Sequence, residues 1–461
     1  MTDNKAAQQM KMFKKEIPEM PEGYFSSGPN PNLEKFIKEH AIPFNPEMDN
    51  YKVLPFDKPI KTTKSTAIYN MHTYWSKKPH DAIQEYIKHY TQPGDMVLDP
   101  FCGSGGTALA ALLEGRKATA IDLSPAATFI TKNYCTPVDV DELEVEFKRL
   151  QKAIKHEMDW LYETRCDRCD GHARTDYLVW SYVFECPRCL KKVPIFDCPE
   201  AKILNNSGQG TKKTTVCPYC KQEGHLEEIS ARSAKRFDPV PVLVKYSCID
   251  GCQPRSDIRL YNDKDPKKQE YFKIFDLKKL KEISKDYSVD FPKTNLPQNT
   301  LSFRLKALNI KNFSELFYIR QQAALNAIKN FSSGSKFQDE ILFLTTALLH
   351  KNSKLMGENK DGGARFLKGM VYIPIIGREV NLLPYVKRTA KAIIDGKREL
   401  TTESEMANWH LLISTQSATN IKEIPDNTID YIFTDPPYGD KVPYGELNLF
   451  WEIWLGMDYS W

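Results

Sequence analysis

Residues 95–122, DMVLDPFCGSGGTALAALLEGRKATAID, decide the fold of this chain. Residues 96–98 predict a short apolar strand, and the turn at 101–106 holds too many glycines to be helical. A small apolar helix and a second strand come next, and the second strand ends in Asp122. This order is typical of half of a doubly wound nucleotide-binding unit. In such a unit the glycines admit a ligand and the closing acid accepts ribose hydroxyls.

The glycine turn and the acid after the second strand supply the candidate ligand-binding residues of this unit. A side chain at Gly103 or Gly105 would obstruct a ligand that approaches the turn. Leu123 would lie beside the base of a bound nucleotide. The full set is Asp99, Pro100, Phe101, Gly103, Gly105, Asp122 and Leu123.

A second stretch, IDYIFTDPPYG at residues 429–439, makes the interpretation of the glycine turn as a ligand-binding turn more specific. Residues 429–434 predict another buried strand, which runs directly into DPPY. Two prolines fix φ and prevent a helix from starting there, so the acid and the aromatic ring are held at the carboxyl edge of the sheet. The candidate catalytic residues are Asp435, Pro436, Pro437 and Tyr438.

These residue types suit methyl transfer to the amino group of a base. That group is a poor nucleophile because its lone pair is delocalised into the ring. The Asp435 carboxylate and the Pro436 carbonyl would each accept one amino hydrogen, which turns the nitrogen lone pair toward a methyl donor. Tyr438 offers a face on which a flipped base stacks. A surface turn capped by Asp435 is the alternative, and the upstream glycine turn argues against it.

DPFCGSGGT together with DPPYG resembles the DNA methyltransferases that methylate amino groups with S-adenosylmethionine. More narrowly, the chain resembles the adenine-specific DNA methylases that carry a Zn-ribbon insert. MHTYWSKKP at residues 71–79 and the continuation DPPYGDKVPYGELNLFWEIWLG at 435–456 are similar to blocks of that family. The CxxC pairs resemble its ribbon.

The resemblance implies an α/β fold, a Rossmann-like class I methyltransferase sheet with a large insert of zinc ribbon and helices. It implies that the turn at Lys78 and Pro79 lies against the methionine end of S-adenosylmethionine, where a lysine or backbone amide meets the carboxylate. The implied activity is methylation of the N6 amino group of adenine in double-stranded DNA. Two alternatives stay open. The first is N4-cytosine methylation, although Asp rather than Ser before PPY favours adenine. The second is a non-catalytic DNA-binding subunit that carries the Zn-ribbon.

The cysteines predict structural zinc. Cys166 and Cys169 stand 16 residues before Cys186 and Cys189, which is close to the spacing of a four-thiolate ribbon. Four protein ligands leave no open position for catalytic water. A second set, separated by 27 residues, is weaker because of its longer loop: Cys217, Cys220, Cys248 and Cys252.

Aromatic residues interleave with basic ones around these cysteine pairs. Tyr177, Trp180 and Tyr182 lie among arginines and lysines that suit contacts with DNA phosphates. A solvated ribbon that only braces the fold is the alternative interpretation.

The composition of the 461 residues agrees with an enzyme of more than one domain. The formal charge of +4 is nearly balanced, so any DNA contact must come from local clusters of basic residues. Eleven cysteines without a secretion signal favour metal ligation in a cytoplasmic protein over disulfides. No segment predicts a membrane span.

The predicted order of domains follows the motifs. A polar leader occupies residues 1–50, and the cofactor half of the methyltransferase domain occupies 51–140. A helical linker with zinc-ribbon modules covers 141–256, and a helical insert for target recognition covers 257–404. The catalytic half, 405–461, closes the chain.

Two features depart from the family pattern. The turn after the strand at 411–414 lacks the acid that would meet the adenine amino group of the cofactor, and Gln416 or a backbone carbonyl would have to replace it. The chain ends at Trp461, before the roughly three further strands of a class I sheet. We therefore expect a split or truncated enzyme, with a complementary C-terminal subunit or a restriction or phage-defence partner. Exposed apolar residues near the end are expected to need that partner: Phe450, Trp451, Ile453 and Trp454.

Overall fold

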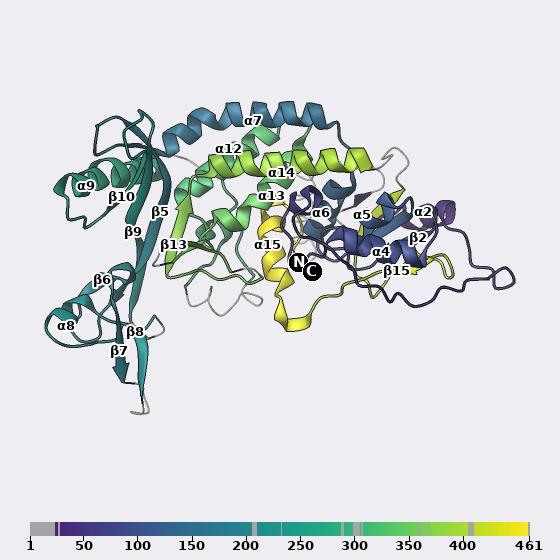
Figure 1. The fold of residues 1–461 in the computed structure, drawn as a ribbon, viewed down its shortest axis with the longest axis horizontal. Helices are drawn as coiled ribbons and strands as arrows, with labels where there is room; N and C mark the ends of the chain where they lie inside the picture. Colours follow the sequence, from purple (N-terminus) through teal and green to yellow (C-terminus); the bar gives the residue numbers. More distant parts are fainter. Residues whose placement is uncertain are drawn as a thin grey trace, which may run out of the picture.

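The computed structural model shows an elongated molecule of mixed α/β type, with a sheet-and-helix body at one end and a β arm at the other (Figure 1). Within its described residues, no helix is both long enough and apolar enough to cross a membrane. These residues are 24–25, 28–204, 210–231, 233–286, 290–297, 305, 308–359, 362–367, 369–403 and 410–459.

A five-stranded parallel sheet forms the centre of the body. Its order is β1 (Tyr24–Phe25), β14 (Leu411–Thr415), β3 (Lys117–Asp122), β2 (Met96–Asp99) and β15 (Tyr431–Ile432). The chain builds outward from β2 through β3 to β14 and then returns to the other side of β2 with β15. Strand order therefore reverses between β2 and β15. Beyond the carboxyl ends of strands at such a reversal, open α/β sheets leave a crevice for ligands.

Helices cover both faces of this sheet because alternate residues of its strands are apolar on both sides. The side chain of Val97 belongs to the same buried hydrophobic cluster as side chains of α4 (His80–Tyr90), α5 (Gly106–Leu113) and α6 (Pro125–Cys135). Met96 and Leu98, one step away along β2, pack on the opposite face with α2 (Leu33–His40). Part of the predicted N-terminal leader therefore belongs to the domain.

The β arm is built on two long antiparallel strands, β5 (His172–Glu185) and β9 (Arg236–Cys248). Ala173 lies opposite Cys248 at one end of this ladder, and Phe184 lies opposite Arg236 at the other. The strand β13 (Ile376–Val380) pairs with β5 and so attaches the arm to the helical insert. The other short elements of the arm and its surroundings are β4 (Glu163–Arg165), β6 (Lys192–Pro194), β7 (Glu200–Leu204), β8 (Thr211–Thr215), α8 (Pro218–Gln222), β10 (Ser256–Leu260), α9 (Pro266–Tyr271), α10 (Lys278–Asp286), β11 (Gly357–Glu358) and β12 (Ala364–Arg365).

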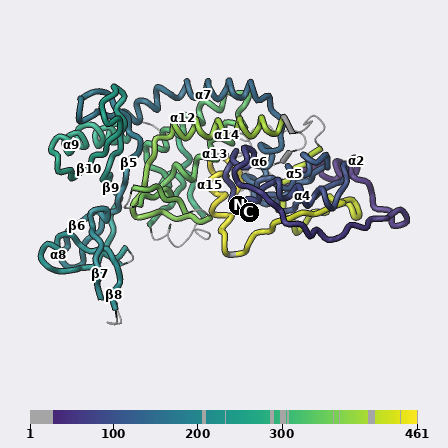
Figure 2. The backbone as a smooth tube through the Cα atoms, in the orientation of Figure 1, coloured from purple at the N-terminus to yellow at the C-terminus, as the bar shows by residue number. Residues whose placement is uncertain are grey.

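Long helices bridge the arm and the sheet (Figure 1). The predicted helical linker begins with α7 (Val140–Leu161), whose N-cap is Asp139. It packs against α12 (Ile319–Ser332) and α14 (Leu382–Glu403), and α13 (Gln338–Leu349) lies next to both α12 and α14. Figure 2 shows the yellow C-terminal trace lying beside the blue trace of α4 and α5.

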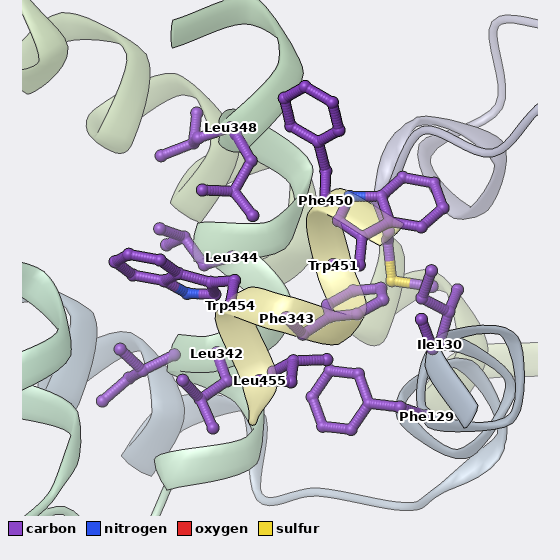
Figure 3. Packing of buried hydrophobic residues seen from close by; sticks show 14 of the residues in the cluster. Phe129, Ile130, Leu342, Phe343, Leu344, Leu348, Phe450, Trp451, Trp454 and Leu455 are labelled. Atoms are coloured by element: carbon purple, nitrogen blue, oxygen red, sulfur yellow. The ribbon is translucent and has the colours of Figure 1, made fainter. Parts of the chain in front are cut away.

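The last helix, α15 (Tyr444–Leu455), contradicts the prediction of exposed apolar residues. Phe450, Trp451, Ile453 and Trp454 are all buried. The helical insert supplies the cover that the sequence seemed to lack, because α13 lays its apolar side chains along α15 while α6 closes the other side (Figure 3). Trp451 is 1% exposed, and its indole Nε1 donates to the Thr346 carbonyl at 2.9 Å.

Replacing Trp451 by alanine should destabilise the protein strongly, because the cavity would open between α13, α15 and the sheet helices. We expect a loss of about 3–5 kcal/mol in the free energy of unfolding, measured by urea denaturation. Leu54→Ala, at a side chain that is 80% exposed, is the matched control and should change it by less than about 0.5 kcal/mol. A small loss for Trp451→Ala would contradict the burial of α15.

Candidate functional site

A cleft of about 220 Å³ opens where strand order reverses. Its walls come from the loop after β2, the end of β3, the turn after β14 and the segment after β15. Most of the residues that the sequence singled out meet here, although more than 300 positions separate the two motifs. Predicted residues that line the cleft are Lys78, Asp99, Pro100, Phe101, Gly103, Asp122, Leu123, Asp435 and Pro437.

The glycine turn is shaped by two close approaches. Gly103 has φ +53°, and a Cβ there would stand 2.9 Å from the Tyr74 ring, so only glycine fits. Gly105 also has a positive φ, yet its added Cβ would meet Thr131 of α6 at 2.8 Å. Gly105 does not line the cleft, so the expected reason for this glycine is wrong. It allows α6 to pack against the turn rather than a ligand to approach it.

Asp122 ends β3 at the cleft with both carboxylate oxygens held by backbone amides. The N–H of Gly103 donates to Oδ2 and the N–H of Ser124 donates to Oδ1, each at 2.9 Å. Burial raises the pKa of Asp122 to about 6, and these two hydrogen bonds work in the opposite direction. The acid is therefore fixed in position by the turn that it closes.

Asp99 lies deeper, at 4% exposure, and organises the turn from below. Its Oδ1 accepts the N–H of Phe101 at 3.1 Å. Burial raises the pKa of Asp99 to about 7, opposed by hydrogen bonds from Thr107 and the Phe101 amide. Nearby Asp122 and Asp435 add repulsion that raises it further.

Two apolar side chains flank the cleft beside the glycine turn and the end of β3. Phe101 is 38% exposed and Leu123 is 44% exposed, which is unusual for side chains of this size beside a buried turn. The turn after β14 contributes Ser417, Ala418 and Thr419. Gln416 does not line the cleft, since its amide contacts the Ser414 hydroxyl at 2.6 Å and the Asn420 carbonyl.

The DPPY segment faces a lysine from the other motif. Lys78 Nζ donates to Asp435 Oδ2 at 2.6 Å, and the hydroxyl of Tyr438 donates to Asp435 Oδ1 at 2.8 Å. Lys78 also donates to the Tyr438 hydroxyl. Pro79, Pro436 and Tyr438 lie next to cleft residues in sequence without lining the cleft themselves.

Several residues of the cleft were not among the predicted site residues, including Tyr74, Phe433, Tyr444 and Asn448. Tyr74 belongs to the block MHTYWSKKP, and Asn448 belongs to the continuation beyond DPPY, so the resemblance carried a signal for both. Asn448 is 1% exposed, and its Nδ2 donates to the Tyr74 hydroxyl at 3.4 Å. Its Oδ1 is buried and has no hydrogen-bond partner among the described residues.

The cysteines form two groups, but the predicted pairing of the CxxC motifs is wrong. Cys186 and Cys189 converge with Cys217 and Cys220, not with Cys166 and Cys169. The facing sulfurs of this group, Cys186–Cys220 and Cys189–Cys217, are 3.6 and 3.7 Å apart. Tetrahedral zinc with Zn–S bonds of about 2.3 Å would require about 3.8 Å.

The second group joins Cys166 and Cys169 to Cys248, with Cys169 and Cys248 sulfurs 3.7 Å apart. Cys252 lies nearby, where its sulfur accepts the Arg168 Nε–H at 3.3 Å. The antiparallel ladder of β5 and β9 explains this nested order. It brings Cys166 and Cys169, which precede β5, beside Cys248 at the end of β9. It also brings the cysteine pair that follows β5 beside the pair that precedes β9.

Several basic residues of the arm are engaged in ion pairs. Arg168 binds Asp257 at 2.5 Å, and Lys212 binds Glu228 at 2.8 Å. Trp180 donates to Glu379 and stacks on Tyr318, with ring centroids 4.5 Å apart. Part of the predicted aromatic and basic cluster therefore holds the arm together. Arg232, a basic residue between Cys220 and β9, lies outside the described residues.

Metal content of double variants tests the nested pairing. Cys186→Ser combined with Cys217→Ser should lower bound zinc by about one ion per chain, because both cysteines belong to one group. Cys186→Ser combined with Cys166→Ser should lower it by about two. Elemental analysis of the purified variants measures both. If the first double variant lost two ions and the second lost one, the CxxC pairs would be grouped in sequence order, as the sequence predicted.

The buried acids predict a dependence of stability on pH. Folding raises the pKa of Asp99 from 3.8 to about 7, so the folded chain binds this proton more tightly than the unfolded chain does. The stability gained from Asp99 is complete below about pH 4 and is lost as the pH rises through 7. The free energy of unfolding should fall across this window by up to about 4 kcal/mol.

Asp99→Asn should remove the part of this fall that Asp99 contributes and leave the part that Asp122 contributes, whereas the exposed Asp426→Asn should keep both. Urea denaturation at several pH values between 4 and 8 compares the three proteins. If the free energy of unfolding fell with pH as steeply in Asp99→Asn as in the parent chain, the carboxyl of Asp99 would not titrate in this window.

Comparison with known proteins finds similarity to DNA methylases over part of the chain. Residues 32–133 match the family described as DNA methylase. The type II methyltransferase M.MjaII of Methanocaldococcus jannaschii is 26% identical over 91 residues, 20% of this chain and 17% of its own length. M.BsoBI of Geobacillus stearothermophilus, also a type II methyltransferase, is 27% identical over 117 residues, 25% of this chain and 21% of its own.

YubD of Escherichia coli (strain K12) is 46% identical over 48 residues, 10% of this chain and 21% of that protein. The chain thus spans about a fifth of the length of the curated relatives that it matches. No solved structure matches it significantly. Residues 32–133 therefore match the DNA methylase family, and the chain shares shorter segments with type II methyltransferases.

Proposed function

We propose that this protein transfers a methyl group from S-adenosylmethionine to the N6 amino group of adenine in DNA, on a Rossmann-like class I methyltransferase sheet. One observation carries the proposal. The glycine turn after β2 and the DPPY segment after β15 border the same cleft, at the point where strand order reverses. A donor held by the first would face an amine held by the second.

The cleft has the groups that S-adenosylmethionine needs. Asp122 presents a fixed carboxylate for the two ribose hydroxyls, and Phe101 and Leu123 present apolar surface for the adenine ring. The orphaned Oδ1 of Asn448 needs a donor, which the amino-acid head of the cofactor carries. When bound, the cofactor supplies an electrophilic methyl group on a sulfonium.

The chain's own residues would prepare the acceptor. Asp435 and the Pro436 carbonyl would accept the two hydrogens of the amino group, which localises the nitrogen lone pair and points it along the cleft. Tyr438 is 42% exposed, so its ring is accessible for stacking on a base turned out of the duplex. The same geometry would serve the N4 amino group of cytosine, and Asp rather than Ser at position 435 favours adenine.

The cysteine groups would hold two structural zinc ions, one at each end of the β5–β9 ladder. In the group at Cys186 all four ligands come from protein, so no position remains for a reacting water. The two ions would stiffen the arm, which together with the helical insert would contact double-stranded DNA.

Asp435→Ala tests the proposal directly. We expect methylation to fall by about 100-fold or more, because no carboxylate remains to accept the amino hydrogen. Binding of S-adenosylhomocysteine, measured by calorimetry, should change little, since Asp122 and the glycine turn are untouched.

Mass spectrometry of nucleosides from DNA incubated with the protein and the cofactor identifies the product. Detection of N6-methyladenine would support the proposal. Detection of N4-methylcytosine would show that the target base is cytosine rather than adenine. Absence of cofactor binding in the parent chain would leave a DNA-binding protein without catalysis.

A further inference from the structure

The carboxylate of Asp435 is already occupied in this structure. Lys78 Nζ lies 2.6 Å from Oδ2 and the Tyr438 hydroxyl lies 2.8 Å from Oδ1. Lys78 also sits over the Tyr438 ring, 5.1 Å from its centroid. Three side chains from two distant motifs therefore form a closed cluster at the edge of the cleft.

This cluster competes with the reaction as proposed. A base amine needs an Asp435 oxygen as its acceptor, and Lys78 and Tyr438 already donate to these oxygens. Each oxygen can accept a second hydrogen bond, but the charged Lys78 ammonium neutralises the carboxylate and weakens it as an acceptor. Departure of Lys78 would therefore make Asp435 a stronger acceptor for the base amine.

The Lys78–Asp435 pair is well placed to exchange. The lysine side chain is 43% exposed and the aspartate 35%, and pairs with this access to water contribute little to stability. Partial burial disfavours the charged lysine, but hydrogen bonds to Asp435 and Tyr438 raise the pKa of Lys78 above its usual value. Its ammonium is therefore charged at neutral pH and free to move to another anion.

The neighbouring lysine cannot play this part. Lys77 also lines the cleft, but its ammonium is buried and donates to the His72 carbonyl at 2.8 Å and the Tyr134 hydroxyl at 3.0 Å. Burial lowers the pKa of Lys77 to about 7. Among the cleft residues that the structure describes, Lys78 is the cation with access to a ligand carboxylate.

We propose that Lys78 is a positioning residue that blocks Asp435 until the carboxylate of S-adenosylmethionine draws it away. This inference rests on the proposed function. It makes binding of the base stronger when the cofactor is present, because an ammonium drawn toward the cofactor carboxylate neutralises Asp435 less.

Binding of a short fluorescein-labelled oligodeoxyadenylate, followed by anisotropy, tests the exchange without turnover. In the full-length parent chain, S-adenosylhomocysteine should raise the affinity by about fivefold or more. Methylthioadenosine shares the nucleoside but has no carboxylate, so it should bind without raising that affinity. Lys78→Met should bind the oligonucleotide more tightly than the parent does in the absence of any cofactor, and S-adenosylhomocysteine should add nothing.

The direction of this effect separates it from simple charge loss. Removal of a lysine ordinarily weakens binding to a polyanion, as the exposed Lys64→Met control should show. The inference is overturned if Lys78→Met keeps the rise caused by S-adenosylhomocysteine, or if methylthioadenosine produces the same rise. Calorimetry of S-adenosylhomocysteine separates a failure of this inference from a failure of the proposed function. If the parent chain does not bind S-adenosylhomocysteine, the proposed function itself fails.

Discussion

Parallel pairing of β15 with β2 is the contact on which the cleft depends. Met96 and Asp430 are 334 positions apart, yet the Met96 amide donates to the Asp430 carboxylate at 2.7 Å and the Asp430 amide donates to the Met96 carbonyl at 3.1 Å. Tyr431 then lies opposite Val97 and Ile432 opposite Leu98. This register places the residue that follows β15 beside the glycine turn. Both carboxyl ends face the same crevice because the strands are parallel.

The helical insert completes the cleft as well as the core. Tyr74 stacks on Trp451 of α15, with centroids 5.7 Å apart, and Gly103 packs closely against the Tyr74 ring. Trp451 is in turn fixed by α13 of the insert through its bond to the Thr346 carbonyl. The shape of the glycine turn is therefore coupled to helices that carry no recognisable motif. A change in the insert would reach the cleft through this aromatic stack.

The β arm is held by buried charge and by its cysteine groups. Arg259 is fully buried and binds Asp276 at 2.6 Å and Asp167 at 3.5 Å, directly beside the group at Cys166. Arg320 of α12 lies 3.0 Å from Glu379 of β13, which also accepts from Trp180 of β5. Buried pairs of this kind lose much of their Coulomb energy to desolvation, but removing one partner is severely destabilising. They fix the orientation of the arm on the helices.

The sequence by itself determined the local elements and the residue types that border the cleft. The strands around Asp99 and Asp122, the helix at 139–161 and the DPPY segment follow from apolar periodicity, glycines and prolines within short windows. Only the tertiary structure decided which distant pieces meet. It paired the cysteines in nested order, buried the aromatic residues of α15 and placed Lys78 on Asp435. Periodicity and spacing report on neighbours along the chain, whereas these contacts depend on strand register and on which helix covers which face.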